Sequence, residues 1–303
     1  MKLSHLLTST KVAFALFASA PALADGHNET AQAPSKTSGP ALWKVADDDT
    51  TIYLFGTVHA LPSGLEWYGD GIANALEASD TIVTEIRMDK QSEAAMQAIA
   101  IQKGLITDGS TLRDLLNEEQ TATYEAAMTQ LELPIEQFDR LEPWMVGLSM
   151  AMIPLMKQGY SPDSGVEKVL LTKIGDKPQD ALETAEFQLD LFDTLPQEKQ
   201  VEFLMEAVEG IDEAKPMLDA MVAESLEGDA DALAELMNEG LSDPVLADAL
   251  LYQRNAKWVD WIETRLDTTP GTVFIAVGAG HLAGEKSVQD LLGKREIEVE
   301  RVQ

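Results

Sequence analysis

The sequence predicts an α/β fold: a central mixed sheet built from two βαβ-like halves at the chain termini, with a large helical insert between them. Strand-like apolar runs lie at residues 51–55 and 81–86 near one end, and at 272–277 and 297–302 near the other. The first run of each pair leads into Gly-x-x-His, and a helix-like stretch separates it from the second run. Because most of the chain between them has helical periodicity, one sheet has to join the two ends.

The first half begins with a predicted hairpin. Residues 42–45 and 51–55 read as strands, and three consecutive aspartates at 47–49 form the turn between them. A helix over 69–78 and a strand over 81–86 follow. This half therefore predicts a strand, a crossover helix and a second strand, an arrangement that prefers a right-handed crossover.

The rest of the chain is mostly helical until the second half of the sheet. The apolar stretch at 144–156 predicts a buried helix, since it is shorter than a bilayer requires and contains Pro154. The remaining predicted elements are helices within 91–160 with breaks near 108–109 and 133–134, a helix over 164–174, a short strand over 180–183, helices over 186–266, a strand over 272–277, a helix over 285–293 and a strand over 297–302.

The composition limits the classes of function. The 303 residues include 22 Lys and Arg against 52 Asp and Glu, a formal net charge of −30, and no Cys. So negative a protein repels phosphate backbones, which disfavours nucleic-acid binding. The lack of Cys excludes disulfides, thiolate metal sites and cysteine nucleophiles.

The N-terminus predicts an exported protein. Lys2 and Lys11 precede or border a short apolar run, and Ala-Leu-Ala at 22–24 matches a cleavage pattern. We therefore expect a signal peptide over residues 1–24, with a membrane anchor as the alternative reading. The apolar run is too short for a stable span, so we expect no membrane insertion after cleavage and a periplasmic or secreted protein.

The mature chain is expected to contain a leader and one domain. Residues 25–40 are polar and contain Pro, Ser and Gly, as is typical of a flexible leader. Residues 41–303 then form a single domain.

The histidines carry most of the chemical information. Beyond His5 and His27, which precede the predicted domain, the sequence contains only His59 and His281. Both end a Gly-x-x-His motif directly after an apolar strand. Ligands of open α/β sheets bind beyond the carboxyl ends of strands, so both imidazoles are expected at one functional edge. Two hydrogen-bonding histidines of purely structural role are the alternative.

Glu85 follows the strand before the insert and completes a possible ligand set. Two neutral imidazoles and a carboxylate hold zinc, manganese, iron or cobalt with open coordination positions, where the ion activates water. We therefore predict His59, His281 and Glu85 as metal ligands, with Glu85 also a candidate base. A surface carboxylate paired with Arg87 is the alternative for Glu85, and Glu183 is a second acid at a strand end.

Several segments together resemble the TraB/GumN family. They are LWKVADDDTTIYLFGTVHALP, IVTEI, LEPW, GVEKVLLTKIGDKP, LETAEFQ, QRNAKW and FIAVGAGHLAGEKSVQDLL, in that order over about residues 41–303. The resemblance implies a site built on His59, Glu85 and His281, to which Arg254 and Glu183 are added as candidate catalytic residues. Where relatives often have Gly-x-Asp, this sequence has an acid with a longer side chain, Glu167.

The wider group of this family includes TIKI proteins, described as metal-dependent proteases, and erythromycin-esterase-like and haem-binding ChaN-like members. The leading hypothesis is therefore an exported metal-dependent hydrolase of a peptide or small molecule, with a peptidase as one form. The alternative is a non-catalytic periplasmic protein that binds haem, metal or peptide. A scaffold or regulatory partner is the third hypothesis.

Overall fold

The computed structural model describes residues 39–239 and 244–303. The predicted signal peptide over 1–24 lies outside the described residues, as does all but the last part of the predicted leader over 25–40. Within the described ranges, no helix combines the length and apolarity that crossing a membrane requires.

Eight strands and twelve α-helices make up the described chain, with five short 3₁₀ or π segments. The strands are β1 Leu42–Ala46, β2 Thr50–Thr57, β3 Leu61–Pro62, β4 Thr81–Thr84, β5 Tyr160–Ser161, β6 Gln179–Ala181, β7 Gly271–Gly278 and β8 Glu300–Arg301. The α-helices are α1 Asp70–Ala78, α2 Lys90–Lys103, α3 Glu118–Gln130, α4 Pro143–Lys157, α5 Val166–Lys173, α6 Ala185–Asp193, α7 Gln197–Glu209, α8 Ala214–Glu227, α9 Ala230–Glu239, α10 Pro244–Ala247, α11 Gln253–Thr268 and α12 Val288–Lys294. The short segments are η1 Leu112–Leu115, η2 Ile135–Phe138, η3 Pro162–Ser164, the π-helix η4 Asp248–Tyr252 and η5 Ala279–His281.

The predicted fold class is confirmed by the pairing of the strands. Six strands form one mixed sheet in the order β6-β4-β7-β2-β1-β8. Strand β7 pairs in parallel with β4 and β2, whereas β1 is antiparallel to both β2 and β8. In the sheet, β7 lies between the two strands of the unit β2–α1–β4. Strands β2 and β1 in turn lie between the two strands of the unit β7–α12–β8. The two ends of the chain therefore interleave in one sheet.

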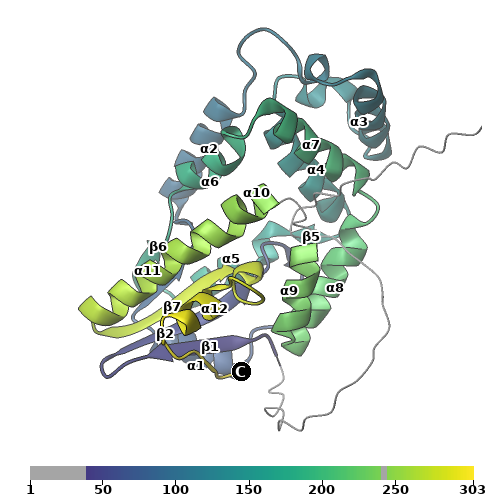
Figure 1. Cartoon of the computed structure of the whole chain (residues 1–303). Coiled ribbons are helices and arrows are strands. Elements are labelled where there is room, and N and C mark those ends of the chain that lie inside the picture. Colours follow the sequence, from purple (N-terminus) through teal and green to yellow (C-terminus); the bar gives the residue numbers. More distant parts are fainter. Residues whose placement is uncertain (1–38, 240–243) are drawn as a thin grey trace, which may run out of the picture.

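Both faces of this sheet are buried, because side chains alternate along its strands. In β7, Phe274 and Ala276 contribute to a core shared with α1, α5 and α8. Their neighbours Val273, Ile275 and Val277 contribute to the opposite core, with α11 and α12. Figure 1 shows α11 and α12 on one side of the sheet and α1 on the other. The sheet thus lies between two helical layers, which cover its faces but not the ends of its strands.

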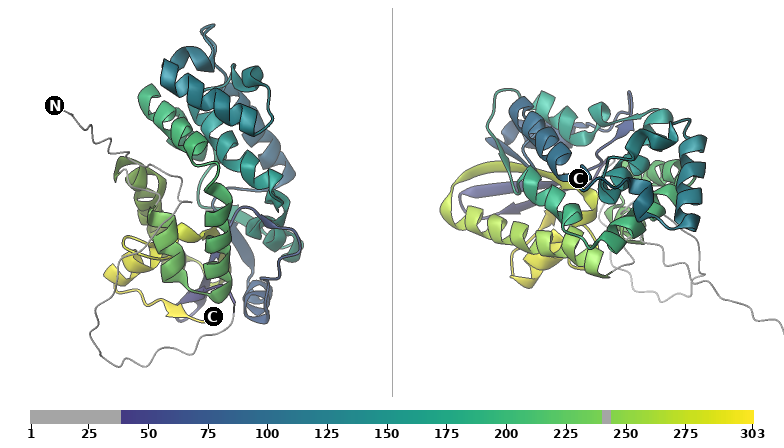
Figure 2. Two further views of the ribbon diagram at one scale, coloured as in Figure 1. Left: turned by 90° about the vertical axis from the view of Figure 1, so that its right-hand side faces the viewer. Right: turned by 90° about the horizontal axis from the view of Figure 1, so that it is seen from above.

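The helical insert has a core of its own. Apolar side chains of α3, α4 and α7 form a cluster separate from the two that cover the sheet. Figures 1 and 2 show these helices at the end of the molecule remote from the C-terminus. The predicted buried helix over 144–156 is confirmed as α4, which starts with Pro143 at its first turn and buries Trp144 fully.

Some boundaries differ from those predicted. The strand expected over 297–302 pairs only at β8, and the helix expected over 285–293 starts later, where the Ser287 side chain accepts a hydrogen bond from the Asp290 N–H. The small pair β3–β5 has no counterpart in the prediction. Each of its strands has two residues, too short for a period-two pattern to be read.

Candidate functional site

His59 lies just beyond the carboxyl end of β2 and is held by a buried acid. Its Nδ1 is 2.6 Å from Oε1 of Glu167, which also accepts a 2.6 Å hydrogen bond from the Thr57 hydroxyl. The His59 side chain is 67% exposed, whereas that of Glu167 is only 7% exposed. The charge of Glu167 raises the pKa of His59. The acid therefore fixes one edge of the ring and leaves the other edge accessible.

The approach of α5 to β2 places Glu167. The Val166 N–H donates to the carbonyl of Val58, over 3.1 Å. A Cβ at Gly165 would overlap the carbonyl oxygen of His59, so only glycine allows this contact. Burial raises the pKa of Glu167, but His59 and two hydrogen bonds outweigh burial and lower it. Glu167 is therefore an ionised partner of His59.

His281 lies at the end of the short segment η5, after β7, in a very different setting. Its side chain is 6% exposed. Its Nδ1 is 2.6 Å from Oδ1 of Asn255, whose amide nitrogen donates to the Lys286 carbonyl over 2.9 Å. A carbonyl only accepts, so Asn255 presents its oxygen to the ring and the proton of His281 resides on Nδ1. Burial lowers the pKa of His281 to about 3, which keeps the ring neutral.

Arg254 joins His281 to two glutamates, Glu85 and Glu183. Its Nη1 is 3.1 Å from Nε2 of His281, and its Nη2 donates to Glu85 Oε2 over 2.5 Å. Its Nε and Nη2 donate to Glu183, and its Nη1 also donates to the Leu250 carbonyl. The five N–H donors of a guanidinium are all used in this way.

Strand pairing brings the two glutamates together. Strand β4 is parallel to β6, and the pairing continues past both strands, because the Glu183 N–H donates to the Glu85 carbonyl over 2.8 Å. Gln188 then bridges the two carboxylates, donating over 2.8 Å to Glu85 and 3.0 Å to Glu183. Oε1 of Glu85 accepts the Gly278 N–H over 2.7 Å. Burial raises the pKa of Glu85, but Arg254 and both histidines lower it well below its usual range.

The structure brings His59, Glu85 and His281 to one place, as the sequence predicts for strand ends. A Cβ at Gly278 would lie 3.1 Å from Glu85 Oε1, 3.6 Å from His281 Cδ2 and 4.0 Å from His59 Nε2. Beside it is a cavity of about 310 Å³, a size typical of small-ligand pockets. Its polar lining includes His59, Glu85, Glu167 and Gln188, and its apolar lining includes Ile86, Met88, Met96 and Pro162.

Arg254 and Glu183, the other two predicted site residues, lie beneath this cavity. Among the described residues that line it, neither appears, nor does His281. The Glu183 carboxylate is 5% exposed and accepts a 2.9 Å hydrogen bond from the Trp258 indole. The predicted residues thus divide into two that face the cavity, His59 and Glu85, and three that lie behind.

The side-chain types of His59, Glu85 and His281 suit a divalent cation, but the hydrogen bonds that Glu85 and His281 already make do not. The Nε2 of His281 faces Arg254, and both oxygens of Glu85 already accept N–H groups. In the described ranges, no group of three or more His, Cys, Asp or Glu side chains is placed to hold an ion. The three-ligand centre does not fit this arrangement, and a metal at these residues stays a prediction.

The sequence assigned no role to four partners of the site: Gln188, Asn255 and Trp258, which lie in the segments LETAEFQ and QRNAKW of the family resemblance, and Glu167 as the carboxylate that holds His59. Asn255 and Trp258 lie on α11 beside and one turn after Arg254, where buried polar groups interrupt an apolar helix face. The π-helix η4 directly precedes this helix, and such segments often occur at functional sites. The signal for Glu167 was its longer side chain after Gly165, a departure noted from the sequence.

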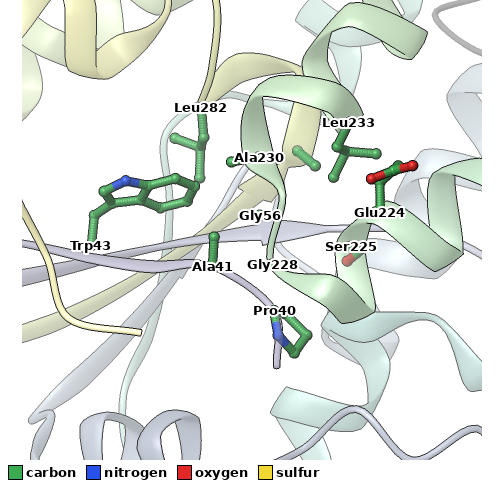
Figure 3. A pocket seen from close by; sticks show the side chains of 11 residues that line it. Pro40, Ala41, Trp43, Gly56, Glu224, Ser225, Gly228, Ala230, Leu233 and Leu282 are labelled. Carbon is green, nitrogen blue, oxygen red and sulfur yellow. The ribbon is translucent and has the colours of Figure 1, made fainter. Parts of the chain in front are cut away.

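A second cavity lies near the first Gly-x-x-His motif but offers little room. Figure 3 shows it between Pro40, Trp43, Leu233 and Leu282. Its volume is about 20 Å³, on the scale of a single water molecule. At its wall, a Cβ on Gly56 would lie 3.1 Å from Ala279 Cα, so the two motifs touch through their backbones.

Comparison with known proteins gives a family match and distant relatives. The model of a family described as the TraB/PrgY/gumN family matches residues 41–301. An uncharacterized protein of Treponema pallidum (strain Nichols) is 21% identical over 84% of this chain and 80% of its own length. The uncharacterized protein YbaP of Escherichia coli (strain K12) is 22% identical over 84% of this chain and 92% of its own. No solved structure matches significantly.

Proposed function

The chain belongs to the TraB/PrgY/gumN family, and from that premise we propose that it is a hydrolase in which His59 moves the proton. The observation that carries the proposal is the pair of His59 and Glu167. A buried carboxylate holds one ring nitrogen at 2.6 Å, and the exposed ring lines a cavity that it shares with Glu85. Paired groups of this kind are how proteins orient a general acid–base imidazole.

The chemistry follows from the two ring nitrogens. Glu167 accepts the proton of Nδ1, which leaves the lone pair of Nε2 toward the cavity when the ring is neutral. Nε2 takes a proton from water as the water oxygen attacks a carbonyl carbon. It then returns that proton to the leaving oxygen or nitrogen, so that an acid and an alcohol or amine are released.

Glu85 is the second residue that we place at the reacting atoms. Its Oε1 accepts the Gly278 N–H and has a further lone pair, near the point that His59 Nε2 also approaches. Because the Glu85 carboxylate stays ionised, it accepts a hydrogen bond from a water bound there and donates no proton to that water. Glu85 therefore orients the water, and His59 takes its proton.

Arg254 and Glu183 act as positioning residues in this proposal. Arg254 holds Oε2 of Glu85, and Glu183 accepts hydrogen bonds from Nε and Nη2 of Arg254. Neither lines the cavity in the part of the chain that the structure describes. We extend the proposal to an exported protein, since the predicted signal peptide supports the periplasm or the exterior as its place of action.

A non-catalytic binding protein is the second candidate, favoured by the apolar part of the cavity. Ile86, Met88 and Met96 offer contact area for a peptide side chain or another apolar group. One observation distinguishes the two functions. A binding protein holds its ligand without hydrolysing it, whether or not His59 carries a proton.

The test is a hydrolysis screen with chromogenic esters and peptide anilides, run with and without added manganese or zinc. We expect turnover by the wild-type protein, and a loss of about 100- to 10,000-fold in His59→Ala. His27→Ala is the matched control, since His27 precedes the predicted domain. Equal turnover in His59→Ala contradicts the proposal, and binding of a probe without turnover favours the second candidate.

A further inference from the structure

The residues behind the cavity, together with Glu85 at its wall, form a closed set of hydrogen bonds. We define the Arg254 cluster as Arg254, Glu85, Glu183, His281 and Asn255. Each donor of the guanidinium has an acceptor, and each carboxylate oxygen has a donor. A buried polar network is stable only when its members are satisfied, and this one meets that condition.

The guanidinium lies where the residue types lead one to expect an ion. It contacts Glu85, Glu183 and His281, two carboxylates and an imidazole, which is the donor set of a divalent cation. The tautomer of His281 is decisive. Asn255 and the Lys286 carbonyl put the ring proton on Nδ1, so the nitrogen left with a lone pair is Nε2, and Nε2 faces Arg254 at 3.1 Å.

We propose that Arg254 takes the place of a divalent cation in this cluster, so that the protein holds its buried carboxylates with a cation of its own. A guanidinium is a permanent cation and binds two carboxylates and an imidazole at fixed angles. Its charge also repels any ion that approaches His281. The wild-type protein therefore holds no divalent ion on His281, and its stability is independent of metal.

The first measurement uses the wild-type protein and two readouts that do not involve turnover. Elemental analysis after exposure to zinc, manganese, iron or cobalt is expected to show no ion that depends on His281, with His281→Ala as the comparison. The melting temperature is expected to be the same before and after treatment with a chelator. One ion per chain that disappears in His281→Ala, or a melting temperature that falls with chelator, overturns the inference.

The second measurement removes the guanidinium. In Arg254→Ala the side chains of Glu85, Glu183 and His281 lose their internal cation, and we expect the melting temperature to fall. Cobalt is then expected to bind at one ion per chain, to raise the melting temperature and to produce visible absorption bands. The double variant Arg254→Ala/His281→Ala is expected to lose this binding, whereas Arg254→Lys, which keeps the charge, should not gain it.

A folded Arg254→Ala protein that binds no cobalt also overturns the inference, because the cluster is then no cation site. Where Arg254→Ala does not fold even with cobalt present, the wild-type measurement decides. The experiment is independent of the proposed hydrolysis, since binding and melting are measured without a substrate.

Discussion

The two Gly-x-x-His motifs are alike in sequence and opposite in setting. His59 is 67% exposed and paired with an ionised glutamate, which raises its pKa. His281 is 6% exposed and lies between an asparagine and a guanidinium, and burial lowers its pKa to about 3. The motifs sit on neighbouring parallel strands, with Thr57 opposite Gly278 in the register. The two motifs therefore share a backbone position in the sheet, but their histidines differ in chemical environment.

The difference comes from helices outside the motifs. Helix α5 delivers Glu167 to His59, and α11 delivers Asn255 and Arg254 to His281. An imidazole with a carboxylate partner and an open edge is suited to proton transfer, whereas one held on both nitrogens is suited to structure. A repeated motif thus places side chains, and the elements that pack on it assign their roles.

The largest expected effect tests the structural role of His281. In His281→Ala, Asn255 Oδ1 and Arg254 Nη1 lose their partners inside the protein, and the ring contact with Trp258 is lost. We expect the free energy of unfolding to fall by about 2–5 kcal/mol, measured by urea denaturation.

His59→Ala is the counterpart at the equivalent motif position. Water replaces its exposed ring, so we expect less than half of the cost seen for His281→Ala. Equal losses of stability in the two variants would mean that the two histidines share one role, and the contrast would be broken.

A smaller effect sharpens the role of the carboxylate beside His59. Glu167→Gln keeps the shape of the side chain and removes its charge, so the pKa of His59 falls towards its ordinary value of 6.5. The base form then persists to lower pH, and the acid limb of the kcat/KM profile moves to lower pH. The plateau drops by roughly tenfold, because a weaker base transfers the proton less readily.

The pKa of His59 is measured by NMR titration, which does not require activity. Thr57→Val is the matched control, because it removes a hydrogen bond to Glu167 but leaves the charge in place. A shift in Thr57→Val as large as in Glu167→Gln would show that packing, rather than charge, sets the pKa.

The smallest expected effect compares the glycines of the two motifs. In both Gly56→Ala and Gly278→Ala the new Cβ has a nearest neighbour at 3.1 Å, so each is expected to cost about 1 kcal/mol of stability. At Gly56 that neighbour is Ala279, whereas at Gly278 it is Glu85 Oε1, with His59 Nε2 also within reach. We therefore expect kcat/KM to fall in Gly278→Ala alone, by less than about tenfold, or 1.4 kcal/mol. Equal kcat/KM values in the two variants would place the reacting atoms elsewhere.

The sheet and the edge at which His59 and His281 lie were predictable from the strand pattern, whereas the family resemblance implied that Glu85 joins them in one site. Apolar alternation and turn residues mark β2, β4 and β7, and parallel strands bring their carboxyl ends to one edge. Residues that directly follow such strands must lie near one another. The same reasoning extends to Glu183 after β6, whose side chain the structure places beside Arg254 rather than in the cavity.

The partners of these residues were not predictable in the same way. Arg254 reaches Glu85 across 169 positions of sequence, and Glu167 reaches His59 across 108. No local period encodes which helix packs on which strand end, because that choice depends on how whole apolar faces fit together. The insert between the halves of the sheet supplies both partners.

By itself the sequence determined the layered α/β fold, the edge at which the site lies and the residue types that meet there, because these follow from the pattern of apolar residues and the direction of the strands. Only the tertiary structure decided which histidine is open and which is enclosed. The packing of α5 and α11 sets the burial, the hydrogen-bond partner and hence the proton of each ring, and no spacing along the chain records that packing.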